Sequence, residues 1–292
     1  MSRLVEGEPA VAVLAGALAR VAALVPYLTA EIEPDGWAAP GGPTAPERLV
    51  AAEGEWMSCG ALIDDPPWLG RIISSTGHGV GTDDPVVAAS VFVQGYSYRV
   101  LTLTVACLTA SGVVPDASAS SMAIGLVRHW PSQLAFTRPA VMMLDPADAV
   151  AALPADSDTI TDAFRFVVDH AIDMHLRPLI ESVRTGIGVP VGQRLLWGNV
   201  AASAATAFRT MEGCLGPFVA PLGERFFALA PPTLRGLGSF VEIEQAGRRG
   251  WFWERTNCCL FDRLPGAVRC ADCSLTPQRQ RRQAYRDSLG AS

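Results

Sequence analysis

Four cysteines near the end of the chain constrain its fold more than any other feature of the sequence. They follow the spacing C-C-x10-C-x2-C and are Cys258, Cys259, Cys270 and Cys273. Thiols at this density hold a metal, form a redox couple or close structural disulfides, and each of these uses ties separate stretches of backbone together. We therefore expect these residues to form a small module of their own.

The N-terminal segment shows no export signal. Its apolar run follows Glu6 and Glu8 and is interrupted by Arg20, which suits neither a signal peptide nor a membrane span. Leu14 and Val21 belong to a set of apolar residues at helical spacing, so we expect an amphipathic helix instead. The expected location is the cytoplasm, a reducing compartment where clustered cysteines bind metal or do redox chemistry more often than they form disulfides.

The cysteine spacing leaves three kinds of site open. A structural zinc ion accepts four thiolates, and Cys270 with Cys273 forms its usual C-x2-C half-site, whereas the adjacent Cys258 and Cys259 do not. A redox disulfide between adjacent cysteines closes a strained ring. A [2Fe–2S] cluster takes four thiolates on two irons, so adjacent cysteines can serve it.

The charge is unevenly distributed along the chain. All 23 basic residues are arginines, and the net charge is -6. Residues 248–292 hold nine of the arginines and only four acids, so a basic segment follows an acidic body. This segment could steer an anionic ligand or an acidic electron-transfer partner, or it could be a solvated arginine-rich helix. We expect no nucleic-acid partner.

Hydrophobic patterning predicts three long helices. Residues 85–110 are mostly apolar, with Asp84 as N-cap and Pro85 at the first helical position. Residues 158–187 place one apolar stripe opposite a row of charged residues. Residues 192–214 contain the run NVAASAATA, whose small side chains allow the close approach of another helix.

Short strands and loops complete the expected fold. Residues 74–85 are expected to form a loop, and residues near 121–144 a β-hairpin. A second hairpin around AGRRG leads directly to the cysteine pair. We therefore predict an α+β fold with a predominantly helical body over 1–236, short antiparallel strands, and a small C-terminal module over 237–292.

The cysteine pattern resembles that of the ferric-siderophore reductases, the FhuF-like family. A second resemblance lies upstream, where HLRPLI (175–180) and LLWGN (195–199) are similar to a helical stretch that these reductases share. In that family the four cysteines ligate an unusual [2Fe–2S] cluster. The resemblance therefore implies that Cys258, Cys259, Cys270 and Cys273 hold such a cluster, and that the module over 237–292 is an iron–sulfur module.

The resemblance also implies an activity, the one-electron reduction of a cytoplasmic ferric siderophore of the hydroxamate type with release of Fe(II). Hard oxygen donors hold Fe(II) much less tightly than Fe(III), so one electron is enough to free the metal. The body over 1–236 would bind the siderophore. Because the sequence has no nicotinamide or flavin fingerprint, the electron is expected from an external donor, a ferredoxin or a flavin reductase.

Aromatic and arginine side chains near the motifs suit a bulky chelate. The candidate substrate-binding residues are Arg248, Arg249, Trp251, His175, Trp197 and Asn199. Each also has a purely structural interpretation: a hairpin packing its tryptophans on the body, a packed or hydrogen-bonded histidine, or a locked turn between helices.

Two other functions remain open at this point. One is a non-enzymatic siderophore-binding protein whose tail is held together by zinc. The other is an electron carrier or redox sensor unrelated to iron uptake. Analysis of the bound metal distinguishes the first from a reductase, and the response of the cluster to ferric chelates distinguishes the second.

Overall fold

The structure is a computed structural model that describes residues 2–28, 30–32, 48–51, 54–127, 130–145 and 150–290. The α-helices are α1 (Glu8–Leu24), α2 (Cys59–Asp64), α3 (Pro66–Gly79), α4 (Pro85–Ser111), α5 (Asp158–Val167), α6 (Arg177–Glu181), α7 (Gln193–Leu215), α8 (Val219–Leu229) and α9 (Gln278–Gly290). The strands are β1 (Ser2–Glu6), β2 (Ala30–Ile32), β3 (Arg48–Ala51), β4 (Gly54–Ser58), β5 (Val113–Pro115), β6 (Met122–Val127), β7 (Trp130–Phe136), β8 (Ala140–Leu144), β9 (Gly238–Gln245) and β10 (Arg248–Arg255). Short π-helical and 3₁₀ turns occur as η1 (Val150–Ala152), η2 (Val168–Leu176), η3 (Ser182–Gly186) and η4 (Phe261–Arg263).

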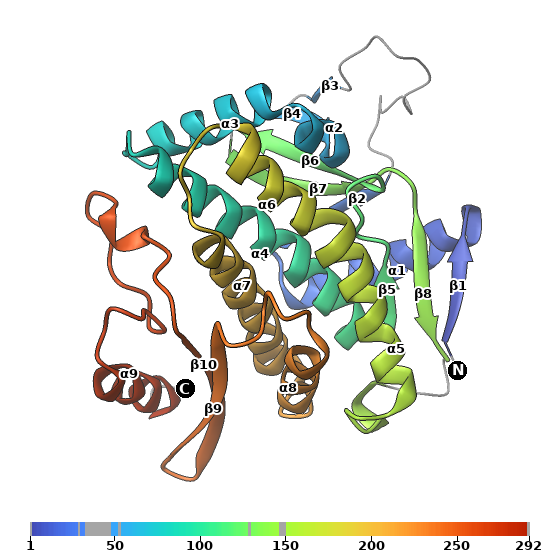
Figure 1. The fold of residues 1–292 in the computed structure, drawn as a ribbon. Coiled ribbons are helices and arrows are strands. Elements are labelled where there is room, and N and C mark those ends of the chain that lie inside the picture. Colours follow the sequence, from blue (N-terminus) through green and yellow to red (C-terminus); the bar gives the residue numbers. More distant parts are fainter. Residues whose placement is uncertain are drawn as a thin grey trace.

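The strands form three small sheets around a helical body, which confirms the predicted α+β class. The sheets have the orders β1-β8-β5, β10-β9 and β2-β7-β6-β4-β3. All pairs are antiparallel except β2 with β7. In Figure 1 the β9–β10 hairpin, α9 and the loop between them lie on one side of the body, beside α7 and far from the N-terminal strand β1. This C-terminal segment contains the four cysteines.

Helix α4 is the central helix of the body. Its start is set as predicted, because the Asp84 carboxylate accepts hydrogen bonds from the backbone N–H groups of Val86 (2.9 Å) and Val87 (3.3 Å). Among the described helices it is the one whose length and composition would suffice to cross a membrane. However, 78% of its most apolar window is buried inside the protein, so its apolar surface serves the core.

Helix α7 packs along α4, as its small residues predicted (Figure 1). Ala201, Ala204 and Ala205 are fully buried. The hydroxyls of Ser97 on α4 and Ser203 on α7 lie 3.0 Å apart, which is possible because both side chains are small. This close pair of helices forms the surface on which the C-terminal segment rests.

The helix predicted over 158–187 is present, but it is interrupted by the π-helical turns η2 and η3. Pro178 explains the first interruption. Its ring nitrogen has no hydrogen to donate to the Met174 carbonyl one turn earlier, and its ring crowds that carbonyl. The backbone N–H of Ala119 donates to the Met174 oxygen instead, at 3.3 Å.

Two boundaries differ from the predicted ones. Residues 74–79 are the last turns of α3, not a loop, because Asp65 caps this helix and Thr76 and Gly77 continue its buried face. Gly77 suits this position because a Cβ there would press on Ala88 of α4. The hairpin near 121–144 is formed by β6 and β7, but residues 140–144 are a separate strand that pairs with β1 and β5.

The second predicted hairpin is formed by β9 and β10. Its two-residue turn consists of Ala246 and Gly247, with φ of 52° and 76°, the combination that matches the twist of the strands. Helix α9 packs on it. Tyr285 donates to the Trp253 carbonyl (2.9 Å), and Arg282 pairs with Glu254 (2.8 Å). β10 therefore delivers a supported backbone to the first cysteines.

Candidate functional site

The four cysteines line one small pocket between the end of β10 and the start of α9. Cys258 and Cys259 enter it directly after the strand, and Cys270 and Cys273 enter it from the far end of the following loop. Cys259 and Cys273 are buried, Cys258 is half-buried and Cys270 is exposed. All four are free thiols, so the fold brings together the side chains that the sequence grouped.

The pocket offers four thiols, the number of ligands that a structural zinc ion or a [2Fe–2S] cluster takes. Within the described part of the chain, no three His, Cys, Asp or Glu side chains converge on one metal position. A structural zinc ion needs four ligands around one point. A [2Fe–2S] cluster needs two thiolates on each of two irons. Four free thiols around one pocket supply the number of ligands that either group needs.

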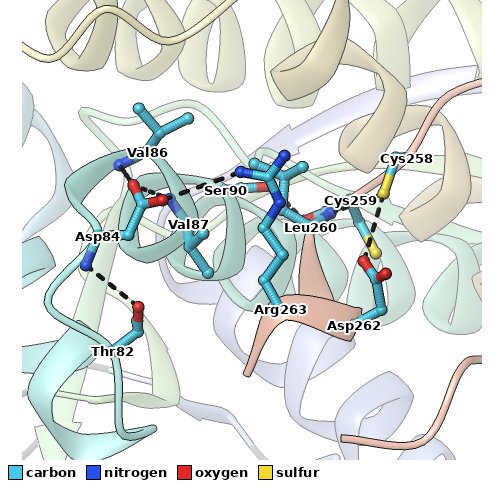
Figure 2. Close-up of polar contacts among 10 residues, drawn as sticks. All are labelled: Thr82, Asp84, Val86, Val87, Ser90, Cys258, Cys259, Leu260, Asp262 and Arg263. Carbon is cyan, nitrogen blue, oxygen red and sulfur yellow. Dashed lines mark hydrogen bonds and ion pairs between the residues drawn. The ribbon is translucent and has the colours of Figure 1, made fainter. Parts of the chain in front are cut away.

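One backbone N–H and one carboxylate of the loop contact the sulfur of the first cysteine (Figure 2). Leu260 adopts the left-handed conformation, with φ of 62°, which a leucine seldom does. In this conformation its N–H donates to Cys258 Sγ at 3.2 Å. The Cys258 thiol in turn lies 3.6 Å from Asp262 Oδ1. The loop is therefore shaped around the sulfur atom.

Cys258 and Cys270 hold their protons in the absence of metal. Burial raises the pKa of Cys258, and the N–H of Leu260 offsets part of the increase. Burial, with the nearby Asp272 and Cys259, raises the pKa of Cys270 to about 11, and only Arg255 acts in the opposite direction. Metal ligation by these thiols at neutral pH must therefore release protons.

A buried hydrogen-bond network joins the pocket to the body. The Ser90 hydroxyl on α4 donates to the Cys259 carbonyl at 2.6 Å. Asn199 on α7 donates through Nδ2 to the Ser90 carbonyl at 2.9 Å, and its Oδ1 accepts a hydrogen bond from Arg255 at 3.0 Å. All four residues are buried. Two helices of the body thus hold the backbone of one cysteine and the arginine beside it.

Arg255 is a buried cation without a carboxylate partner. It lines the cysteine pocket and is 3% exposed. Its guanidinium donates to neutral oxygens, those of Asn199 and the Gly198 carbonyl, and its Nε has no hydrogen-bond partner. No described acid lies within ion-pair distance of it. A buried charge without compensation is costly, so this one points to an anion in the pocket.

Gly198 allows the loop to approach α7 closely. A Cβ at this position would overlap the side-chain amide of Asn257, the residue before the cysteine pair. The Asn257 amide donates to the Leu195 and Cys258 carbonyls, at 3.5 Å and 3.2 Å. The LLWGN motif is therefore a contact surface for the cysteine loop.

Apolar side chains seal the other side of the loop. Leu260 and Leu264 pack on Val87 and Val91 of α4. Arg263 extends from the same loop toward Asp84, the N-cap of α4, at 3.9 Å (Figure 2). Both members of this pair are well exposed, so its contribution to stability is small. Burial of the leucines and the polar network supply the attachment.

The candidate substrate residues from the body are internal. His175 is fully buried; its Nδ1 donates to the Ala117 carbonyl at 2.7 Å, and its Nε2 accepts from Tyr96 at 2.7 Å. Burial lowers its pKa to about 4. Trp197 is also buried, with Arg177 over its ring at 5.4 Å. Asn199 belongs to the network described above.

The candidates from the hairpin lie away from the cysteines. Arg248 is exposed and donates to the Leu289 carbonyl, and Arg249 is exposed between Glu242 and Glu244. Trp251 is half-buried on β10. None of the six candidate residues lines the cysteine pocket or the cavity next to it.

Sequence reasoning missed Ser90, Arg255 and Asn257. Ser90 lies 169 positions from the carbonyl that it binds, and nothing local marks it. Arg255 gave a weak signal, since it is a charged residue at the end of a strand, three positions before Cys258. Asn257 could have been found from its place directly before the cysteine pair.

Family comparisons agree with this site. The model described as ferric iron reductase FhuF-like transporter matches residues 90–240, which is 151 of the 292 residues. The model described as FhuF 2Fe-2S C-terminal domain matches residues 255–275, the loop that contains all four cysteines. Of the three kinds of site left open by the spacing, these matches select the iron–sulfur cluster.

Other comparisons are weaker. No curated protein is similar to this chain at a significant level. Among solved structures, aerobactin synthetase IucC from Klebsiella pneumoniae is 16% identical with a TM-score of 0.42. The match covers 62% of this chain and 32% of the synthetase, so the chain spans about a third of that protein's length. A likeness of this size carries no functional argument. The match over residues 90–240 does establish the family: this chain belongs to the FhuF-like ferric iron reductases, and its cofactor is a [2Fe–2S] cluster.

Proposed function

We propose that this protein reduces a ferric siderophore by one electron and so releases Fe(II). The observation that supports this most strongly is the pocket of four free thiols beside a buried, unpaired arginine, inside the stretch that matches the 2Fe–2S domain. The cysteines Cys258, Cys259, Cys270 and Cys273 are the proposed ligands. When bound, a [2Fe–2S] cluster supplies single electrons.

The chain's own residues set the charge at this pocket. Four thiolates and the two sulfides of a bound cluster would together carry more negative charge than the two irons neutralise, and a further electron would add to it. Arg255 places a fixed positive charge in a buried setting, where charge interactions are stronger than in water. The N–H of Leu260 adds a dipole directed at Cys258 Sγ. Both favour the reduced state, which raises the reduction potential.

The domain organisation follows from this division of roles. Residues 1–236 are proposed as the siderophore-binding body and residues 237–292 as the iron–sulfur module. The Ser90, Asn199 and Arg255 network then fixes the module on the body at the electron-transfer site. Such a protein has no need of an acid–base catalyst, because the reaction transfers an electron and breaks no covalent bond.

Finer features of the function are also proposals. The substrate is proposed to be a ferric siderophore of the hydroxamate type and the location to be cytoplasmic. The donor is proposed to be a ferredoxin or a flavin reductase. The basic helix α9, with Arg279 exposed and Arg286 half-buried on it, suits the approach of an acidic electron-transfer protein.

A visible absorption spectrum of anaerobically purified protein tests the proposal. The expected bands bleach with dithionite and return when ferrichrome, a ferric trihydroxamate, is added. Cys258→Ser is expected to lose the bands while keeping its far-ultraviolet circular dichroism. Cys214→Ser, which alters an exposed thiol outside the pocket, is the matched control and keeps them. A reduced protein that ferrichrome fails to reoxidise contradicts the proposal.

A further inference from the structure

A cavity of about 500 Å³ adjoins the cysteine pocket. Helices α4 and α7 form its floor, Trp130 of β7 closes one side, and the cysteine loop closes another. Two residues, Phe261 and Cys270, line both this cavity and the cysteine pocket. A molecule in the cavity would therefore touch a side chain that is itself proposed to hold iron.

The cavity has an apolar wall with a few polar groups, the usual make-up of a ligand site. Val91, Gly95 and Ala202 line it together with three aromatic residues, Tyr98, Trp130 and Phe261. The Trp130 ring lies against Gly95, where a Cβ would come within 3.1 Å of it. Glycine at this position lets the ring lie flat on α4 and leaves the space beside it open.

Arg99 supplies the cation in this cavity. It is half-buried, near the Trp130 ring, and donates to the carbonyls of Ser132 (3.2 Å) and Gly95 (3.0 Å). No described carboxylate lies within ion-pair distance of it. Gln94, one residue before Gly95, has a buried Oε1 without a hydrogen-bond partner. The cavity thus presents an unpaired cation, and an unpaired acceptor lies buried in its wall.

We infer that this cavity is the docking site for the ferric chelate, an inference that rests on the proposed function. The chelate would lie against Cys270, where the electron path to Fe(III) is shortest. Fe(III) would gain one electron and the reduced protein would lose the same electron. Arg99 would donate to the anionic oxygens of the chelate.

The charges in the cavity favour a hydroxamate. Among the residues that line the cavity, Arg99 and Asp272 are charged, and their charges cancel. Three hydroxamates neutralise Fe(III), whereas three catecholates leave three negative charges on the complex. A neutral complex suits a lining whose net charge is zero. A complex with three negative charges would be repelled by Asp272, and Arg99 could offset only one of them. Docking of this kind also explains why Cys270 is the exposed cysteine.

Binding and electron transfer can be measured separately on cluster-loaded protein. Gallium-substituted ferrichrome has the same charge and shape as the ferric complex and accepts no electron, so calorimetry with it reports binding alone. Reoxidation of the dithionite-reduced protein by ferrichrome reports transfer. Ferricyanide, a small oxidant that needs no such cavity, reports whether the cluster itself is intact.

Arg99→Gln is expected to weaken binding of the gallium complex by about tenfold or more, the effect of losing a charged hydrogen-bond donor. Thr206→Trp fills the cavity from an exposed position and is expected to block it without disturbing the core. Both variants should keep ferricyanide reoxidation within about twofold of the wild type.

The matched control is Arg71→Gln. Arg71 also lies over a tryptophan, Trp68, and lines a cavity of similar size, about 470 Å³, that contains no cysteine. It should bind the gallium complex as the wild type does. If ferrichrome reoxidises the wild type and both cavity variants equally well, the docking site is wrong and the reductase function stands. If ferrichrome reoxidises none of them, the reductase function itself is wrong.

Discussion

The guanidinium of Arg255 donates to Oδ1 of Asn199 at 3.0 Å, and both side chains are buried. One residue belongs to the strand that precedes the cysteines and the other to the central part of α7. The arginine is thus held by a neutral amide and not by a carboxylate, which would neutralise its charge. This arrangement keeps a full positive charge at the wall of the cysteine pocket.

Removing that charge should lower the reduction potential of the cluster. Arg255→Gln is expected to shift the potential downward on the order of tens of millivolts, because the reduced state loses a buried counter-charge. A redox titration followed by electron paramagnetic resonance measures the shift. Arg263→Gln, which alters an exposed arginine of the same loop, is the control and should change the potential much less.

Asn199→Asp tests the same point without removing the arginine. The new carboxylate would lie in the position of Oδ1 and pair with the guanidinium, so the potential should fall as in Arg255→Gln. A potential that is unchanged in both variants would show that the buried charge does not act on the cluster.

Gly198→Ala should loosen the cysteine loop. The added methyl group overlaps the Asn257 amide, so either the loop or α7 has to move, at a cost of about 1–3 kcal/mol. We expect a lower melting temperature and faster loss of the visible absorption on exposure to a chelator. Gly213→Ala, on the same helix with open space around it, is the control and should stabilise by about 0.5–1 kcal/mol. Equal behaviour of the two variants would contradict the role assigned to Gly198.

His175 should make the body acid-sensitive. Burial lowers its pKa from 6.5 to about 4, against the opposing effects of the Ala117 carbonyl and Asp116. Below pH 6.5 the unfolded chain therefore binds a proton that the folded protein does not. Stability from this residue is complete above pH 6.5 and is lost as the pH falls toward 4, on the order of 1–3 kcal/mol.

Urea unfolding between pH 7.5 and pH 4.5 measures this effect. His175→Gln should be less stable at neutral pH but should lose less stability on acidification than the wild type. His170→Gln, on the same helix with a half-buried ring, is the control and should follow the wild-type curve. An unchanged pH dependence in His175→Gln would contradict the prediction.

Local signals predicted much of the fold. Asp84 and Pro85 marked the start of α4, and the small residues of α7 predicted its close packing. The boundary of α3 was missed because two glycines near its end suggested a loop, whereas Gly77 is required by contact with Ala88. The first π-helical stretch, η2, was missed because the effect of Pro178 on one carbonyl lies outside any hydrophobic pattern.

The sequence predicted only those site residues that lie close to one another along the chain. The four cysteines lie within sixteen positions of each other, and the family resemblance rested on them. Ser90 and Asn199 act on the pocket from helices distant in the sequence, and only tertiary structure brings them there. Asn199, a candidate substrate residue from the LLWGN motif, forms its hydrogen bonds inside the protein. A motif fixes the identity of a residue without fixing what its side chain contacts.

The central claim is that this protein passes one electron at a time from a cluster on four cysteines to a ferric chelate. The most direct test is a single turnover under anaerobic conditions. Reduced protein, freed of dithionite, is mixed with excess ferrichrome in the presence of a chromogenic Fe(II) chelator. The account predicts loss of the reduced-cluster paramagnetic signal and one Fe(II) for each cluster oxidised. Protein that contains zinc, or that loses its reduced signal without forming Fe(II), would contradict it.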